Sequence, residues 1–202
     1  MADGHFPVRL QTSARSFALL SPKTPESGVI FVHGFKGNPS TTWVDFEHLV
    51  DGIEKYRDSW GKCDLFFYGY ASHNQIRPLA ESFLEFLKYV ATRNEQRLIK
   101  SDLPLPSVIE NVSAIPTGLL SQRGKAKYRN LTLVGHSTGA VIIRQAILLH
   151  LKQVRTERPD FAAWVADQKT PDAPDFGDQL IVRAFVRLFA PAHLGGSCPA
   201  FS

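Results

Sequence analysis

The fold is decided by residues 130–149, NLTLVGHSTGAVIIRQAILL. The first seven residues form a short apolar run that ends in Gly135 and His136. From Thr138 onward the stretch is apolar around most of its circumference at helical spacing, and a helix of that kind is buried rather than superficial. The stretch therefore predicts a core strand that turns directly into a buried helix, with Ser137 at the junction.

This junction places Ser137 between two glycines, in the sequence Gly135-His136-Ser137-Thr138-Gly139. A sharp turn from strand to helix holds a serine in strained backbone geometry and projects its hydroxyl above the sheet edge. Side chains two residues before and after it would collide with the flanking strand and helix, so glycine is used there. The spacing alone is common in turns, but its position between a core strand and a buried helix favours an activated nucleophile.

Further apolar runs extend the pattern on both sides. The runs that predict strands are 28–34, 63–70, 130–136 and 182–192. Helical spacing of apolar residues lies between them, at 40–56 and 76–90. Alternating strands and helices predict an α/β fold, a three-layer sandwich with a mostly parallel sheet and helices on both faces. The opening segment, 6–21, predicts one or two additional edge strands.

Two segments interrupt this alternation within a single predicted domain that spans residues 1–202. Residues 100–128 and 158–178 each carry three prolines and have weak periodicity. We expect both to be insertions at strand–helix junctions. They are either surface loops or a lid or wall of the substrate site, since long loops in compact domains are often functional.

A second motif, His33-Gly34-Phe35, ends the first core strand. The carboxyl ends of parallel strands meet at one sheet edge, so this motif is expected beside Ser137. Gly34 lets the backbone approach a substrate, and the backbone N–H groups of Phe35 and Thr138 are the expected donors of an oxyanion hole. We expect His33 to be structural.

The chain resembles the α/β-hydrolase superfamily, in particular its serine esterase and lipase-like branch. The pieces that carry the resemblance are VIFVHGF, DLFFYGY, LVGHSTGAVIIRQAI and VRLFAPAHLGGS, which together span about residues 28–197. The resemblance implies a nucleophile at Ser137, an oxyanion hole at Phe35 and Thr138, and hydrolysis of a small-molecule or lipid-like carboxylic ester. It does not fix the substrate.

The acid and the histidine of a catalytic triad are not evident after Ser137. In this fold they follow the serine in that order, and only His150 and His193 remain. His150 lies more than three helical turns beyond Ser137 and is expected to point away from the site. His193 has no acid near it, because Asp175 and Asp178 lie at the other end of the last predicted strand, about 30 Å away.

The resemblance therefore implies a hydrolase fold that is truncated after its sixth strand, with the acid and histidine beyond Ser202. A sheet cut there would expose an apolar edge and favour self-association. Two other interpretations stay open. One is a hydrolase-fold module that binds or regulates without catalysis, and the other is peptide or thioester cleavage by the same machinery.

Composition excludes several other classes. The net charge of +4 comes from 23 basic and 19 acidic residues that are scattered along the chain, which argues against nucleic-acid binding. The segment 34–40, GFKGNPS, lacks the ending of a P-loop, and no Cys/His cluster has metal-ligand spacing, so we expect neither cofactor nor metal. Cys63 and Cys198 indicate no disulfide framework. With neither a signal-like start nor an apolar window of ~18 residues, we expect a cytoplasmic protein without a transmembrane segment.

Overall fold

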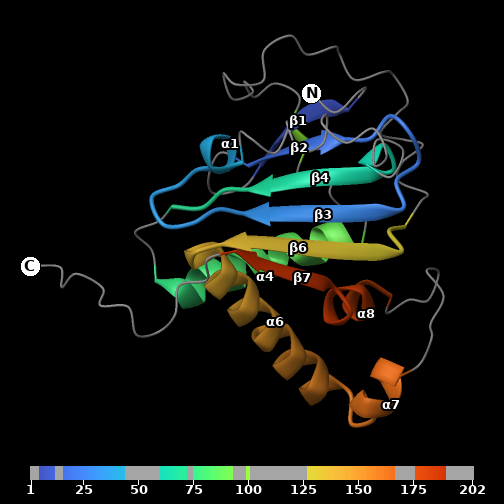
Figure 1. Cartoon of the computed structure of the whole chain (residues 1–202). Helices are drawn as coiled ribbons and strands as arrows, with labels where there is room; N and C mark the ends of the chain where they lie inside the picture. The colour runs from blue at the N-terminus through green and yellow to red at the C-terminus, as the bar shows by residue number, and fades with distance from the viewer. Residues whose placement is uncertain are drawn as a thin grey trace, which may run out of the picture.

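A computed structural model of the chain describes residues 5–11, 16–43, 60–71, 75–92, 99–100, 127–166 and 176–189. The strands are β1 (Phe6–Leu10), β2 (Phe17–Leu20), β3 (Ser27–Val32), β4 (Cys63–Tyr68), β5 (Ile99–Lys100), β6 (Asn130–His136) and β7 (Phe185–Phe189). These described strands form one seven-stranded sheet in the order β5-β1-β2-β4-β3-β6-β7 (Figure 1).

The sheet has a parallel half and an antiparallel half. Strands β4, β3, β6 and β7 are parallel neighbours, with β3 between β4 and β6. Strands β1 and β2 pair antiparallel with each other, and β2 joins the parallel half through β4. The additional strands predicted for residues 6–21 are thus present, although β2 lies inside the sheet and β5 forms its edge.

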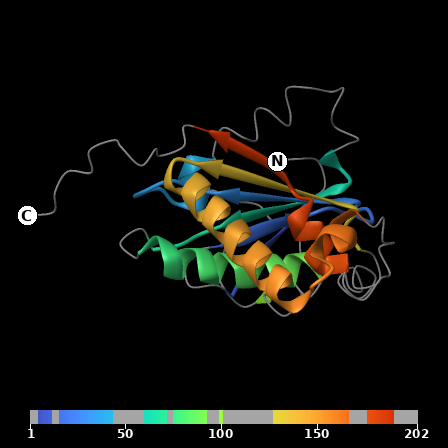
Figure 2. The same ribbon diagram turned by 90° about the horizontal axis from the view of Figure 1, so that it is seen from below.

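The helices are α1 (Pro39–Thr42), α4 (Ile76–Ala91), α6 (Thr138–Glu157), α7 (Phe161–Ala166) and α8 (Phe176–Val182). Figure 2 shows α4, α6 and α8 on the same side of the sheet. Of the stripe that sequence spacing predicts for α4, Ile76 is half-buried, and the others are buried: Leu79, Phe83, Phe86, Leu87 and Val90. The α/β class predicted from the sequence is confirmed by this strand and helix arrangement.

The opposite face of the sheet carries a separate apolar cluster. Its buried members are Phe17, Leu19, Val29, Phe31, Leu65, Phe67 and Val134. The ring of Phe67 stacks between Phe17 and Phe31, at centroid distances of 4.5 and 4.9 Å. Of the helix expected over 40–56, the structure describes only the short α1, and residues 44–59 lie outside the described part. The second helical layer stays a prediction.

Two sequence expectations need correction near the carboxyl end. The strand predicted over 182–192 begins only at Phe185, because α8 continues to Val182. Just after α8, the N–H of Ala184 donates a hydrogen bond to the carbonyl of Ile181 at 3.2 Å. The segment 158–178 is not a plain loop, since it contains α7 and the start of α8. Trp164 of α7 is buried, with the guanidinium of Arg158 4.9 Å from its ring centre. Most of 100–128 lies outside the described residues.

One stability prediction follows from the packing of α6 against α8. His150 is 1% exposed, and this burial lowers its pKa more than the adjacent carbonyl and carboxylate of Asp178 raise it. Lys88 also lowers this pKa, and Glu157 raises it. A lowered folded-state pKa contributes stability that is present above the unfolded value of 6.5 and is lost as the pH falls below it.

We therefore expect the free energy of unfolding to fall less in His150→Gln than in the wild type as the pH is lowered from about 7.5 to about 5.5. The difference should be at most about 1.4 kcal/mol per pH unit. The measurement is urea unfolding at both pH values. Because His33 also has a lowered pKa, the comparison uses the difference between the two proteins. Equal losses in both would contradict the assignment.

Candidate active site

Ser137 stands at the junction of β6 and α6 in an unusual backbone conformation. Its φ is 51° and its ψ is −120°, and among the described residues only Lys36 shares a positive φ without being glycine. Such a conformation costs about 1–3 kcal/mol and persists only where the surroundings fix it. Here the N–H of Ser137 donates to the carbonyl of Phe189 at 3.0 Å, and its carbonyl accepts from Ala140 at 3.0 Å.

The two flanking glycines have no room for a side chain. A Cβ added to Gly139 would lie 2.3 Å from the carbonyl oxygen of Val32 and 2.5 Å from that of His33. A Cβ on Gly135 would lie 2.8 Å from the Cα of Ala140. The first turn of α6 thus lies directly on the backbone of β3, and glycine is required at both positions for the steric reason given by the sequence.

The loop after β3 lies against the serine. A Cβ added to Gly34 would stand 2.9 Å from the Cβ of Ser137 and 2.9 Å from Nδ1 of His136. The carbonyl of Gly34 accepts hydrogen bonds from Nδ1 of His33 at 2.8 Å and from the N–H of Gly37 at 3.1 Å. The structure therefore brings Gly34 against His136 and Ser137, about 100 residues further along the sequence.

These bonds also fix the direction of the next amide. The Gly34–Phe35 peptide is trans, so its N–H points opposite to the carbonyl that His33 and Gly37 hold. Within the described part of the chain, neither this N–H nor that of Thr138 has an acceptor. Thr138 is the first residue of α6, where the helix leaves its N–H groups unpaired and the dipole favours negative charge.

His33 itself is a structural residue. It is fully buried, its ring stacks on Tyr70 at 4.2 Å, and its Nε2 accepts the N–H of Tyr70 at 3.3 Å. Since Nε2 is an acceptor, the proton lies on Nδ1, and burial lowers the pKa of the ring. The hydroxyl of Tyr70 donates back to the carbonyl of His33 at 2.8 Å. A neutral imidazole in this position orients the Gly34 loop. Sequence reasoning did not identify Tyr70 as its partner.

His136 directly precedes the serine and lies between the Gly34 loop and Trp43. Its ring meets Trp43 edge-on at a centroid distance of 6.5 Å. Its Nδ1, close to Gly34, is buried and has no hydrogen-bond partner among the described residues, and the same holds for Nε1 of Trp43. Trp43 is therefore an aromatic neighbour of the turn that contains His136 and Ser137, on the face of the sheet opposite α4 and α6.

The described residues do not bring an acid and a histidine to Ser137. Nε2 of His150 lies 3.3 Å from the carbonyl oxygen of Asp178 and 3.7 Å from its carboxylate, but this pair is about 20 Å along α6 from the serine. The buried Asp64 is the second residue of β4 and lies at the amino end of that strand. Its carboxylate accepts hydrogen bonds from the N–H of Ser21 and the hydroxyl of Tyr128. Asp175 and His193 lie outside the described residues.

No group of three or more His, Cys, Asp or Glu side chains in the described ranges is arranged to hold a metal ion. Among the helices that the structure describes, none has the length and apolar character needed to cross a membrane.

The chain was compared with known proteins. No model of a protein family matches it, and no curated protein matches it. Among solved structures, it is similar to an esterase B from Lactobacillus rhamnosis, with 13% identity over 74% of this chain and a TM-score of 0.42. It is similar to a lipase from Bacillus licheniformis, with 15% identity over 85% of this chain and 70% of that one, and a TM-score of 0.39. A lipase-esterase related protein from Clostridium acetobutylicum has 14% identity over 88% of this chain and 70% of that one, and a TM-score of 0.30. The chain spans 41% of the length of the esterase.

The close contact at Gly139 predicts that alanine at this position destabilises the protein, although alanine normally stabilises a helix relative to glycine. In a helix, Gly→Ala normally stabilises by up to about 1 kcal/mol, but at Gly139 the methyl group would meet backbone oxygens that cannot move aside. We expect Gly139→Ala to lower the free energy of unfolding by about 3 kcal/mol or more, measured by urea unfolding.

The matched control is Gly177→Ala, which also changes the second residue of a helix. Its added methyl would come within 3 Å of one atom, the methyl carbon of the exposed Thr92 at 2.8 Å, and would keep ordinary distances of 3.8 Å from the backbone of Ala91 and Thr92. We expect a change within about 1 kcal/mol. A Gly139 variant as stable as this control would show that α6 does not lie on β3 as described.

Proposed function

We propose that this protein is a serine hydrolase that cleaves carboxylic esters through an acyl-enzyme on Ser137. The observation that supports the proposal is the positive φ of Ser137 between the core strand β6 and the first turn of α6, enforced by the closely packed Gly135 and Gly139. A non-glycine residue held in such a conformation at the carboxyl rim of a sheet is typical of an exposed nucleophile.

In the proposed reaction, Oγ of Ser137 attacks the acyl carbonyl and forms a tetrahedral intermediate. The N–H groups of Phe35 and Thr138 stabilise its oxyanion, assisted by the positive end of the α6 dipole. The serine proton passes to a base and then to the alcohol, which leaves as the C–O bond breaks. Water then cleaves the acyl-enzyme to release the acid. The base is not among the residues that the structure describes.

One observation favours a second candidate, a non-catalytic module that binds an ester or a related ligand. In the described ranges, the one histidine–carboxylate contact is His150–Asp178, which is remote from Ser137. A module of this kind would bind its ligand equally well after Ser137→Ala. A hydrolase would retain binding and lose covalent labelling, so the labelling test separates the two.

The direct test is covalent labelling by a fluorophosphonate probe, in which the oxygen of an activated serine displaces fluoride and becomes phosphonylated. We expect one probe molecule per chain, on Ser137, as located by peptide mass spectrometry. Ser137→Ala should abolish labelling. The control Ser82→Ala, which removes an exposed hydroxyl on α4, should leave it unchanged. Labelling of both variants alike, or of neither the variants nor the wild type, would contradict the proposal.

The oxyanion hole is tested through Gly34. The methyl group in Gly34→Ala would press on Cβ of Ser137 and Nδ1 of His136, both 2.9 Å away, and would push the Phe35 amide off its position. Because one oxyanion donor is worth about 10²–10³ in rate, we expect labelling to slow by up to that factor.

The control for this variant is Gly28→Ala, at the amino end of β3, the strand that precedes the Gly34 loop. Its methyl group would meet only side-chain atoms of Leu131 and Tyr128, at 3.2 Å or more. We expect it to be labelled at the wild-type rate, with folding of both variants checked by circular dichroism. An unchanged labelling rate in folded Gly34→Ala would remove the Phe35 amide from the mechanism.

A further inference from the structure

Unpaired polar atoms are buried where α8 packs against α6. His150 of α6 is 1% exposed, and Gln179 of α8 is 2% exposed. Among the residues that the structure describes, Nδ1 of His150 and both polar atoms of the Gln179 amide have no hydrogen-bond partner. A buried polar atom without a partner opposes burial. The junction is therefore held less firmly than the buried Leu180 and Ile181 of α8 alone would hold it.

The other nitrogen of His150 faces α8. Nε2 lies 3.3 Å from the carbonyl oxygen of Asp178 and 3.7 Å from its carboxylate. If the neutral ring donates from Nε2 to that carbonyl, protonation adds a second N–H at Nδ1, for which the described residues offer no acceptor. Burial has the largest influence and lowers the pKa of His150, as does Lys88 of α4, whereas Asp178 and Glu157 raise it. A positive charge on the ring therefore opposes the docking of α8.

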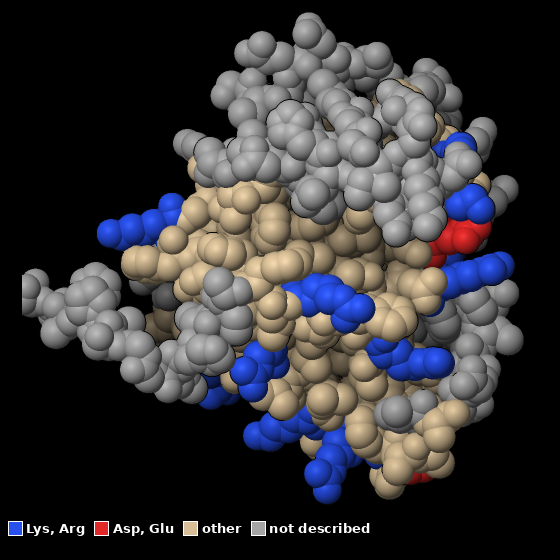
Figure 3. Space-filling model, in the orientation of Figure 1, with Lys and Arg blue, Asp and Glu red and all other residues tan. Residues whose placement is uncertain are grey.

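The surface around this junction is basic. Figure 3, in the orientation of Figure 1, shows Lys and Arg around β7 and α6 and few Asp or Glu. A proton on His150 would add charge of the same sign to this region. The ring would regain hydration, and the charge would be screened, if α8 moved off α6. The exposed basic residues of α6, β7 and the link between α8 and β7 are Arg144, Lys152, Arg155, Arg183 and Arg187.

The helix α8 is closely joined to β7. Only residues 183 and 184 separate the two elements, and their N–H groups donate to α8 carbonyls at 3.0 and 3.2 Å. Val186 of β7 packs against the same apolar core cluster that contains Leu180 and Ile181 of α8. Residues 176–189, which we call the α8–β7 unit, are therefore held to the core together.

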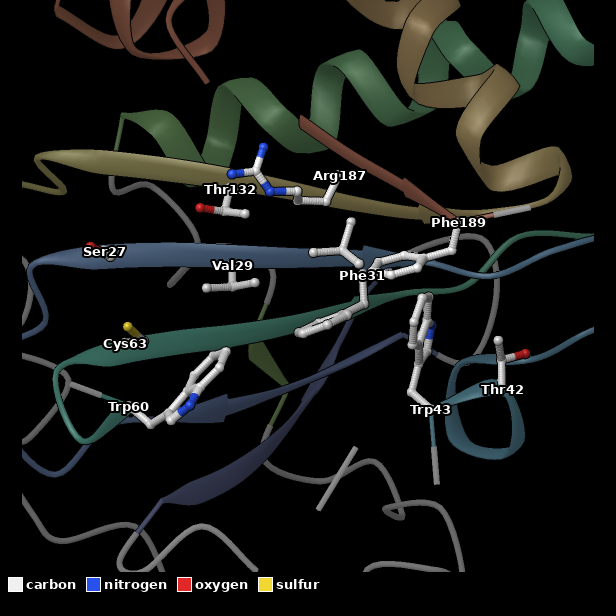
Figure 4. A pocket seen from close by; sticks show the side chains of 11 residues that line it. Ser27, Val29, Phe31, Thr42, Trp43, Trp60, Cys63, Thr132, Arg187 and Phe189 are labelled. Carbon is white, nitrogen blue, oxygen red and sulfur yellow. The ribbon is translucent and has the colours of Figure 1, made fainter. Parts of the chain in front are cut away.

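The strand β7 links this unit to Ser137. It is the last strand of the described sheet, and it pairs with β6. Figure 4 shows Arg187 and Phe189 on the face of the sheet turned away from α4, and both side chains are exposed. The burial that holds β7 therefore comes mainly from its helix side. At its carboxyl end, the carbonyl of Phe189 accepts the N–H of Ser137 at 3.0 Å, which helps to hold the positive φ of the serine.

We propose that the α8–β7 unit is a pH-sensitive element that positions Ser137: protonation of His150 releases α8 from α6, loosens β7 and weakens the hydrogen bond from Ser137 to Phe189. Its effect on catalysis rests on the proposed hydrolase function. Acid would thereby lower the reactivity of the serine without involving the catalytic base. A single group that titrates at 6.5 when exposed and stays neutral when buried raises the opening equilibrium at most about tenfold between about pH 7.5 and pH 5.5.

The first test is hydrogen exchange followed by mass spectrometry at both pH values, with rates corrected for intrinsic exchange. In the wild type, protection of residues 176–189 should fall by about fivefold to tenfold at the lower pH. These residues should also exchange faster than β3, because the unit opens locally. In His150→Gln, whose amide is neutral, the fall should be less than about twofold. Equal falls in both proteins, or exchange of the unit only together with β3, would overturn the proposal.

The second test removes the unpaired amide. Gln179→Leu keeps the size of the side chain and should raise the protection of residues 176–189 about fivefold or more at both pH values. The control is Gln75→Leu, the same change at an exposed position that makes no side-chain capping bond. It should leave the protection unchanged. Lower protection in Gln179→Leu would show that the amide stabilises the junction, contrary to the proposal.

The third test links the unit to the serine through the rate of fluorophosphonate labelling. Leu180→Ala removes a buried contact of α8 and should raise the opening equilibrium about thirtyfold or more. Labelling should slow in proportion to the open fraction that exchange reports, and more so at pH 5.5. Adding His150→Gln should remove this extra loss at acid pH. The control Leu148→Ala, at a position 59% exposed on α6, should be labelled like the wild type.

These tests distinguish the failure of this inference from the failure of the proposed function. Labelling that does not follow the open fraction would overturn the link to Ser137 and leave the hydrolase function standing. The expected exchange results in a protein that is never labelled would remove the hydrolase function and leave the pH-sensitive α8–β7 unit standing.

Discussion

The structure depends on the contact between the first turn of α6 and the backbone of β3. At Gly139 not even a methyl group fits, because the carbonyl oxygen of Val32 would lie 2.3 Å from it. The helix can approach the strand this closely only if the connection from β6 is a single sharp turn, and that turn forces Ser137 to a positive φ. The proposed chemistry is thus a consequence of how a helix packs on a sheet. The cost of the strain is offset by the burial of α6.

The same contact brings two separate segments to one rim. Parallel pairing of β3 with β6 places their carboxyl ends side by side, so the Gly34 loop and Ser137 meet although they are distant in sequence. Tyr70, which follows the neighbouring strand β4, holds His33 in one tautomer, and His33 in turn holds the carbonyl of Gly34. Residues that follow two adjacent strands, β3 and β4, therefore determine the direction of the Phe35 amide.

The sequence predicted the elements with long, strong periodicity and missed details that depend on distant contacts. The stripe of α4 and the β6–turn–α6 unit were predictable because each is a local pattern of apolar residues. The expectation that α6 is buried around most of its circumference was wrong, since only one face is buried and Leu148 is exposed. The boundary between α8 and β7 was not predictable, since the apolar pattern around Val182 and Phe185 is compatible with both helical and strand periodicity. Hydrogen bonds in the folded structure decide between the two. The roles of Tyr70 and Trp43 depend on partners that are remote in the chain, and no spacing rule identifies such pairs. The motif at Ser137 could be found from the sequence because its two flanking glycines are required where no side chain fits.

The most direct test of the account is a crystal structure of the protein after reaction with a fluorophosphonate. It should show phosphorus bonded to Oγ of Ser137, with the phosphoryl oxygen about 3 Å from the backbone nitrogens of both Phe35 and Thr138. The φ of Ser137 should remain positive in the adduct, because packing and not the ligand fixes it. A phosphonate attached to another residue, or an oxygen directed away from both amides, would contradict the central claim.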